Sequence, residues 1–252
     1  MSPVQIIADA DENLYVSDEG CDRISIWDRS GEFVGRWGDS GNEDGKFDSP
    51  SGIAFDSNDN LFVVDSQNGR IQEFTKNGKY LGKWGEQGTC DGQLNLPWGI
   101  CLDKEDNVYV ADWKNNRVQK FTPDGKLLVI FQGTDGGVGD LHGPTGVAVD
   151  SEGDVYVTDW GNHRLQVYGP EGKFVTTLVG DAQQPSPWTQ TYIDANPDII
   201  KARRRADMEP EWRFHRPVAV NVDTQDRIII LESYRHRLQI YNKVKDYEEH
   251  SL

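Results

Sequence analysis

The sequence has few cysteines, no long apolar run and a shortage of positive charge. Its 252 residues include three cysteines at unrelated repeat positions, which do not predict a disulfide framework and favour a reducing, cytoplasmic compartment. No apolar run reaches the roughly 18 residues of a membrane-spanning helix, and the first residues do not resemble a signal peptide. The sequence therefore predicts neither a membrane span nor a secretory leader.

Acidic residues outnumber basic ones by 42 to 26, for a formal net charge of −16. Such a charge repels phosphate backbones and disfavours nucleic acid as a general partner. Eight Trp, nine Tyr and nine Phe nevertheless provide large apolar areas for a core. This composition indicates a folded, acidic and soluble protein.

Several sequence motifs of enzymes are also absent. The chain contains no Gly-x-Ser-x-Gly nucleophile elbow, no phosphate-binding loop and no dinucleotide fingerprint. We therefore assign no catalytic residue, no metal ligand and no cofactor.

The sequence does contain a repeated pair, an acid followed five residues later by Arg. The first four acids are spaced by 47 residues, and the fifth follows after 73 residues, which is one period plus 26. A period in this range indicates a propeller or solenoid, whose units need stacked neighbours. The five pairs are Asp18/Arg23, Asp65/Arg70, Asp112/Arg117, Asp159/Arg164 and Glu232/Arg237. Their recurrence favours a structural role, in which the acid accepts turn N–H groups and the Arg pairs with it.

Each period contains four short strands separated by turns. In the third copy they cover residues 98–103, 107–112, 117–122 and 126–131, with Pro97 at the mouth of the first. Four strands in about 40 residues are typical of a propeller blade. The predicted fold class is therefore an all-β propeller of four-stranded blades.

The fourth copy shows the pattern best, from Pro144-Thr-Gly-Val-Ala-Val-Asp150 through Asp159-Trp-Gly-Asn-His-Arg-Leu-Gln-Val-Tyr168 to Gly172-Lys-Phe174. This pattern resembles the NHL repeat, and the resemblance implies a β-propeller, commonly six-bladed. Only five copies are visible, so a five-bladed ring, a larger ring that has lost a blade, and an open arc completed by a partner all remain. We expect one domain over residues 1–252, with blades at 3–47, 48–94, 95–141, 142–180 and 214–252 and an inter-blade insertion at 181–213.

Departures from the repeat concentrate at two positions that lie on one face of a four-stranded meander. These positions are the loop after the second strand and the connection that enters the next blade. We predict a binding face from the residues Trp98, Trp113, Lys114, Trp160, His142, His215, Tyr234 and Arg235. Exposed rings give large contact areas at small entropic cost, which suits recognition of a protein or peptide.

The insertion has a helical pattern of its own. Asn196 can cap a helix that begins with Pro197 and runs to Met208. Arg203, Arg204 and Arg205 form the one basic cluster, which could contact an anion or a partner. With its aromatic residues, the insertion could also form a lid over the axis.

Three functions stay open from the sequence. The first is a non-catalytic binding scaffold, with oligomerisation possible if the ring is incomplete. The second is a metal-dependent lyase or hydrolase with an axial site built from His142, His215 and Asn221. The peptidyl-amidating lyase, a propeller of this kind, has its zinc histidines directly after the entry proline, where this chain has Val4, Ser51, Trp98, Thr145 and Val218. The third is an RNA-binding propeller that uses Arg203 to Arg205.

Overall fold

The computed structural model describes residues 2–133, 137, 139–183, 187–205 and 209–243, of which residues 187, 188, 209 and 211 by their backbone alone. Five antiparallel sheets follow one another, and we call them blades 1 to 5. The strands of blade 1 are β1 (Pro3–Ala8), β2 (Leu14–Asp18), β3 (Arg23–Trp27) and β4 (Phe33–Trp37). Those of blade 2 are β5 (Pro50–Phe55), β6 (Asn60–Asp65), β7 (Arg70–Thr75) and β8 (Tyr80–Trp84). Those of blade 3 are β9 (Pro97–Leu102), β10 (Val108–Asp112), β11 (Arg117–Phe121) and β12 (Leu127–Phe131).

Blades 4 and 5 complete the set. The strands of blade 4 are β13 (Pro144–Val149), β14 (Val155–Asp159), β15 (Arg164–Tyr168) and β16 (Phe174–Leu178). Those of blade 5 are β17 (Pro217–Val222), β18 (Arg227–Glu232) and β19 (Arg237–Asn242). The place of a fourth strand in blade 5, for which the sequence pattern is poor, falls on residues 244–252, outside the described residues. Within every blade each strand pairs with the next one along the chain, as in a meander.

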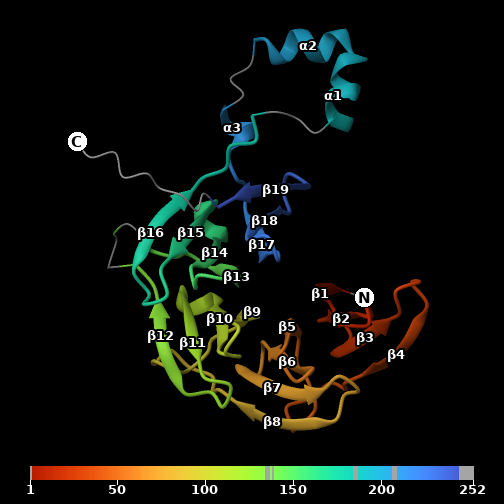
Figure 1. The fold of residues 1–252 in the computed structure, drawn as a ribbon, viewed down its shortest axis with the longest axis vertical. Helices are drawn as coiled ribbons and strands as arrows, with labels where there is room; N and C mark the ends of the chain where they lie inside the picture. Colours follow the sequence, from red (N-terminus) through yellow and green to blue (C-terminus); the bar gives the residue numbers. More distant parts are fainter. Residues whose placement is uncertain (1, 134–136, 138, 184–186, 206–208, 244–252) are drawn as a thin grey trace.

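The blades are arranged as an arc around a common axis (Figure 1). The innermost strands β1, β5, β9, β13 and β17 pack side by side in chain order. The chain is thus a five-bladed propeller of the predicted all-β class. Figure 1 shows the arc open between blade 5 and blade 1.

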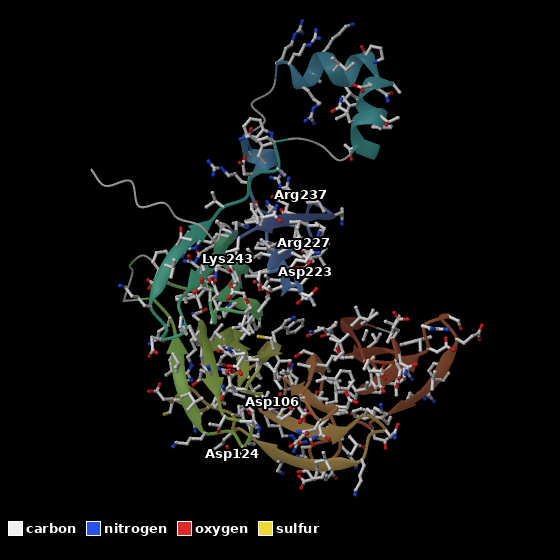
Figure 2. The ribbon with its side chains drawn as sticks, viewed as in Figure 1. Asp106, Asp124, Asp223, Arg227, Arg237 and Lys243 are labelled. Carbon is white, nitrogen blue, oxygen red and sulfur yellow. The ribbon has the colours of Figure 1, made fainter. Side chains whose placement is uncertain are left out.

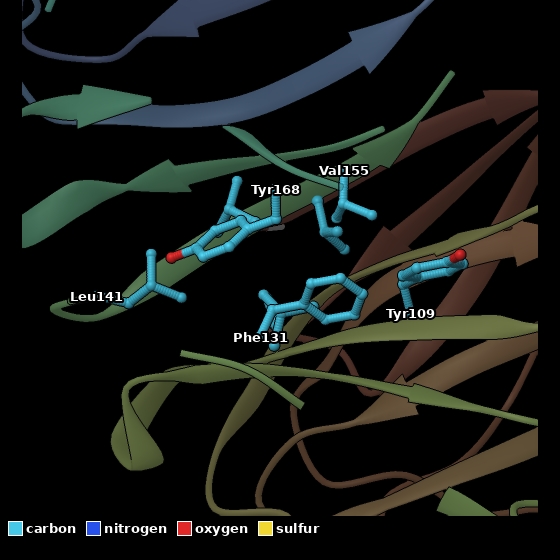
Figure 3. Close-up of a cluster of buried hydrophobic side chains, with 9 residues drawn as sticks. Tyr109, Phe131, Leu141, Val155 and Tyr168 are labelled. Atoms are coloured by element: carbon cyan, nitrogen blue, oxygen red, sulfur yellow. The ribbon is translucent and has the colours of Figure 1, made fainter. Parts of the chain in front are cut away.

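The core consists of layers between neighbouring blades. Figure 3 shows the layer between blades 3 and 4, with Tyr109, Phe131, Leu141, Val155 and Tyr168 facing one another. The ring centroids of Phe131 and Tyr168 are 5.9 Å apart in an edge-to-face arrangement. Because each layer takes its side chains from two blades, a blade depends on its neighbours for a dry core.

The described part of the insertion contains three short helices, α1 (Pro187–Asp194), α2 (Pro197–Arg203) and α3 (Glu209–Trp212). The sequence indicated α2 but not α1, and α2 ends earlier than expected, at Arg203. Asn196 occupies the N-cap position, but its side chain makes no capping bond and instead donates to the carbonyl of Tyr192 at 2.6 Å. The end of the predicted helix, residues 206–208, lies outside the described residues.

The described helices α1 and α2 of the insertion do not cover the axis. Figure 1 shows α1 and α2 beyond the outer edge of blade 5, which contradicts the expected lid. The two ends of the insertion pair with each other, since Ala182 N–H donates to Trp212 at 3.2 Å and Phe214 N–H donates to Val179 at 2.8 Å. These two bonds form the base of the insertion. From this base the chain extends away from the blades and then returns to β17.

Candidate functional site

The acid of each repeated pair binds the chain segment that enters its own blade. Asp159 accepts a hydrogen bond from the backbone N–H of His142 at 2.7 Å, and Glu232 accepts one from that of His215 at 2.8 Å. Blades 2 and 3 contain the same bond. The bond holds the entering segment beside the loop between the second and third strands. Residues that differ from the repeat in this loop and in the entering segment therefore lie on the same face of the propeller.

The Arg of the pair extends this arrangement. In blade 3, Arg117 Nε donates to Asp112 at 2.9 Å, and its Nη2 donates to the carbonyls of Cys90 and Gln93 at 2.7 and 2.9 Å. Asp112 is fully buried, and burial raises the pKa of its carboxyl although Arg117 and other donors act against the rise. The pair therefore joins the second strand, the third strand and the blade entry.

At the junction of blades 4 and 5, a guanidinium lies between two aromatic rings. Cζ of Arg216 lies 4.4 Å from the ring centroid of Trp160 and 4.6 Å from that of Tyr234. Arg216 Nη1 also donates to the hydroxyl of Tyr234 at 2.7 Å. Tyr234 is 59% exposed, so the stack is accessible from solvent and already ordered by its own contacts.

Two imidazoles adjoin this stack. The ring of His215 lies 4.8 Å from that of His163 and 5.2 Å from that of Tyr234, between centroids. The backbone N–H of Arg216 donates to Nδ1 of His163 at 3.1 Å. Burial lowers the pKa of His163, and the neighbouring His215 and Arg216 lower it further.

The same face continues towards blade 3. The ring of His142 packs against Gly161, the residue after Trp160, where an added Cβ would lie 2.1 Å from the imidazole. Gly143 packs against the indole of Trp113, with 2.7 Å from an added Cβ to Nε1. Lys114 Nζ lies 4.3 Å from the centroid of the Trp113 ring.

These contacts connect residues of blades 3, 4 and 5, partly through Gly143 and Gly161, and we call the set the aromatic strip. Its members are Trp113, Lys114, His142, Trp160, His163, His215, Arg216 and Tyr234. His163 and Arg216 were not among the residues predicted from the sequence for the binding face. A signal existed for Arg216, because the residue before each entry proline also varies, with Ser49, Leu96 and Gly143 in blades 2 to 4. These four residues share a positive φ of 49 to 62°, so this backbone conformation belongs to the repeat and not to the site alone.

Trp98 lies elsewhere. It lines a hollow of about 690 Å³ between the innermost strands, together with Val4, Thr145, Val218 and Asn221. Neither His142 nor His215 is among the described residues that line this hollow. The structure thus does not bring together the His142, His215 and Asn221 of the axial-enzyme hypothesis.

Arg235 and the basic cluster also lie apart from the strip. Arg235 donates to the carbonyl of Pro210 in α3, so it faces the insertion. Arg203 ends α2, and Arg204 and Arg205 follow it at the outer end of the insertion. Figure 2 shows Arg237 on the side of blade 5 that faces the insertion, where it donates to Trp212 and Arg213 carbonyls at 3.1 and 2.6 Å.

The described residues show neither a metal-binding cluster nor a membrane-spanning helix. No group of three or more His, Cys, Asp or Glu side chains among them could hold a metal ion. No helix in the described part of the chain has the length and apolarity needed to cross a membrane.

The repeats are similar to a known family of repeats. The family model described as NHL repeat matches residues 47–74, 94–121 and 141–168. The chain is an NHL-repeat β-propeller. Each of the three matches ends within the third strand of its blade and includes the repeated acid–Arg pair. No curated protein sequence matches the chain.

Solved structures share the architecture of this NHL propeller. Virginiamycin B lyase from Staphylococcus aureus is 13% identical, with a TM-score of 0.60 over 96% of this chain and 70% of that one. A streptogramin B lyase is 14% identical, with a TM-score of 0.60 over 97% and 70%. A chain of a nidogen/laminin complex is 19% identical, with a TM-score of 0.59 over 96% and 80%. At these identities the likeness shows the fold alone, and it includes both enzymes and a binding protein.

Proposed function

We propose that this NHL propeller is a non-catalytic binding module that presents the aromatic strip to a protein or peptide. The observation that supports this most directly is the Trp160–Arg216–Tyr234 stack. Trp, Tyr and Arg are the residue types that dominate binding energy in protein interfaces. Because the three side chains already hold one another, little conformational entropy remains to be lost on binding.

The charge of the strip indicates the chemistry of its partner. Lys114 and Arg216 bring positive charge to one face of a chain whose net charge is −16. The two acids that bind the backbone of His142 and His215, Asp159 and Glu232, are fully buried and already engaged by these N–H groups. We therefore propose that the bound segment supplies carboxylates or backbone carbonyls to Arg216 and an apolar group to the rings.

The proposal can be tested by selecting peptides from a random displayed library on the wild-type protein. Selected peptides are then titrated against Trp160→Ser and Arg216→Ser, which introduce the residues that blade 2 has at the same positions, Ser66 and Ser49. We expect at least tenfold weaker binding to each variant, because loss of a central interface residue costs about 2 kcal/mol.

A matched control removes exposed apolar side chains away from the strip. Leu128 in β12 and Val175 in β16 are 45% and 56% exposed on outer strands. Leu128→Ser and Val175→Ser should leave peptide binding unchanged. Peptides that bind the two strip variants as tightly as the wild type would contradict the proposed site.

A further inference from the structure

In three blades, the residue before the Arg of the repeated pair is bonded to the entry of the next blade. In blade 1, Oδ1 of Asp22 accepts a hydrogen bond from the backbone N–H of Ser49 at 2.8 Å. In blade 3, Oδ1 of Asn116 accepts one from the backbone N–H of Gly143 at 2.9 Å. Ser49 and Gly143 directly precede the entry prolines of blades 2 and 4, so we call this contact the turn-to-entry bond.

Blade 4 forms the turn-to-entry bond with a histidine. Nδ1 of His163 accepts the backbone N–H of Arg216 at 3.1 Å, and Arg216 directly precedes the entry proline of blade 5. A ring nitrogen accepts a hydrogen bond only while it carries no proton, so this bond requires a neutral imidazole with its proton on Nε2. The ordinary pKa of a histidine is 6.5, so a modest fall in pH can remove this acceptor.

The bond also joins the two sides of the Trp160–Arg216–Tyr234 stack. His163 follows the short helix η2 (Trp160–Asn162), and its backbone N–H donates to the carbonyl of Trp160 at 3.4 Å. Arg216 places its guanidinium 4.4 Å from the ring centroid of Trp160. The side chain of His163 therefore connects the turn that carries Trp160 to the backbone that carries Arg216.

On the basis of the function proposed above, we propose that His163 is a positioning residue that makes binding at the aromatic strip depend on pH. A proton added to Nδ1 sets an N–H donor against the N–H of Arg216 and places a positive charge beside the guanidinium. The two groups then separate, by movement of the ring or of Arg216. The stack is less ordered as a result, and its ligand binds more weakly because ordering Arg216 again costs free energy.

The groups around His163 favour the neutral ring at neutral pH. Burial lowers the pKa of His163, and His215 and Arg216 lower it further, whereas the carboxylate of Asp159 acts in the opposite direction. The turn-to-entry bond is therefore intact at neutral pH and is lost as the pH falls through a folded-state pKa below 6.5. The next groups, in contact with His215 through its ring and its backbone N–H, are Tyr234 and Glu232.

Loss of this bond should leave the propeller folded. Blade 2 has Gly69 at the position of His163, so blade 3 is attached without such a side chain. Gly69 also cannot oppose the N–H of Leu96, whereas a protonated His163 opposes that of Arg216. Protonation should therefore disturb the strip without unfolding the protein.

The test measures binding of histidine-free selected peptides that require Arg216, at pH 7.5 and at pH 5.0. The ratio of the Kd at pH 5.0 to the Kd at pH 7.5 should be about threefold or more higher in the wild type than in His163→Asn, because the competent fraction of the wild type falls. Asn suits this test, since Asn116 makes the same bond in blade 3. His236→Asn, at the same position in blade 5 and outside the strip, should keep the wild-type ratio. Equal ratios in the wild type and in His163→Asn would overturn the proposal.

A second variant tests the positioning role at constant pH. His163→Gly, which copies Gly69 of blade 2, removes the acceptor at pH 7.5. It should weaken binding about threefold, and His163→Asn should restore most of this loss. Binding to His163→Gly as tight as to the wild type would also overturn the proposal.

NMR spectra without peptide separate failure of this inference from failure of the proposed function. The ring nitrogen shifts of His163 and the amide shift of Arg216 should change with one midpoint below pH 6.5 in the wild type, and the amide should not follow in His163→Asn. Peptides that require Arg216, with an Arg216 amide that does not follow His163, would overturn this inference alone. An amide that follows His163, with no selected peptide that requires Arg216, would overturn the proposed function and leave only a proton-sensitive contact.

Discussion

The acid–Arg pair recurs in every blade, but its hydrogen bonds differ from blade to blade. Arg117 reaches Asp112 and two carbonyls of the blade entry, and both side chains of the pair are buried. Arg23 lies 3.7 Å from Asp18, and its Nε has no hydrogen-bond partner in the part of the chain that the structure describes. The two pairs occupy the same position of the sequence repeat, but their surroundings give them different hydrogen bonds.

We predict that Arg117→Met and Arg23→Met will differ strongly in their effect on stability. Arg117→Met leaves the carboxylate of Asp112 buried without its charged partner, which costs about 3–5 kcal/mol. Arg23→Met should cost about 1 kcal/mol, because it removes only a long and poorly paired contact. Urea denaturation of both variants and the wild type gives the two values, and equal losses would contradict the prediction.

His163 should make the protein sensitive to acid. Its pKa in the folded state lies below the ordinary value of 6.5, so folding favours the neutral ring. The associated stability is fully present above pH 6.5 and is lost as the pH falls through the lower folded-state pKa. We expect the unfolding free energy to fall less between pH 7.5 and 5.5 in His163→Asn than in the wild type.

Asn suits this test because Asn116 occupies the same position in blade 3 with a φ of 53°, close to the 57° of His163. His236→Asn, at the same position in blade 5, serves as the matched control. If both variants follow the pH dependence of the wild type, His163 is not the titrating group.

At the scale of elements, the innermost strands approach one another closely while the outermost strands do not. Gly99 in β9 faces β13, and an added Cβ would lie 2.4 Å from the carbonyl oxygen of Thr145. A Cβ added to Gly82 in β8 would have no atom of the described residues within 4 Å. The close approach of β9 and β13 therefore requires glycine at position 99, whereas β8 has room for a larger residue at position 82.

Gly99→Ala should destabilise the protein by about 1–3 kcal/mol, because two backbones would have to separate. Gly82→Ala should stay within about 0.5 kcal/mol of the wild type, because the methyl group enters open space. Thermal unfolding of the two variants distinguishes them. Similar Tm values would show that β9 and β13 can move apart at no cost.

At the scale of the whole molecule, the arc and the insertion are separate features. Ala182 pairs with Trp212, and Val179 pairs with Phe214 at the base of the insertion. Phe214 is buried in the core of blades 4 and 5, whereas α1 and α2 lie beyond the rim (Figure 1). The stability of the propeller should therefore not depend on the helices α1 and α2.

We predict that residues 183–211 can be replaced by Asn-Gly, which forms a two-residue turn between paired strands. The unfolding free energy should change by less than about 1 kcal/mol, because the base bonds and Phe214 remain. Circular dichroism should retain the β signal and lose the helical contribution. A loss of cooperative unfolding would show that the helices support the blades.

The sequence by itself determined the strands, the turns between them, the blade period and the start of α2. These features depend on local patterns such as the entry proline, the alternating apolar residues and the acid–Arg pair, which recur whatever lies nearby. Only the tertiary structure decided that Trp160, Arg216 and Tyr234 form one stack, that Trp98 lines the axis instead, and that Arg203 to Arg205 lie outside the ring. Those outcomes depend on which blades become neighbours and on the direction in which the insertion leaves its base. Contacts between residues of different blades have no local pattern in the chain.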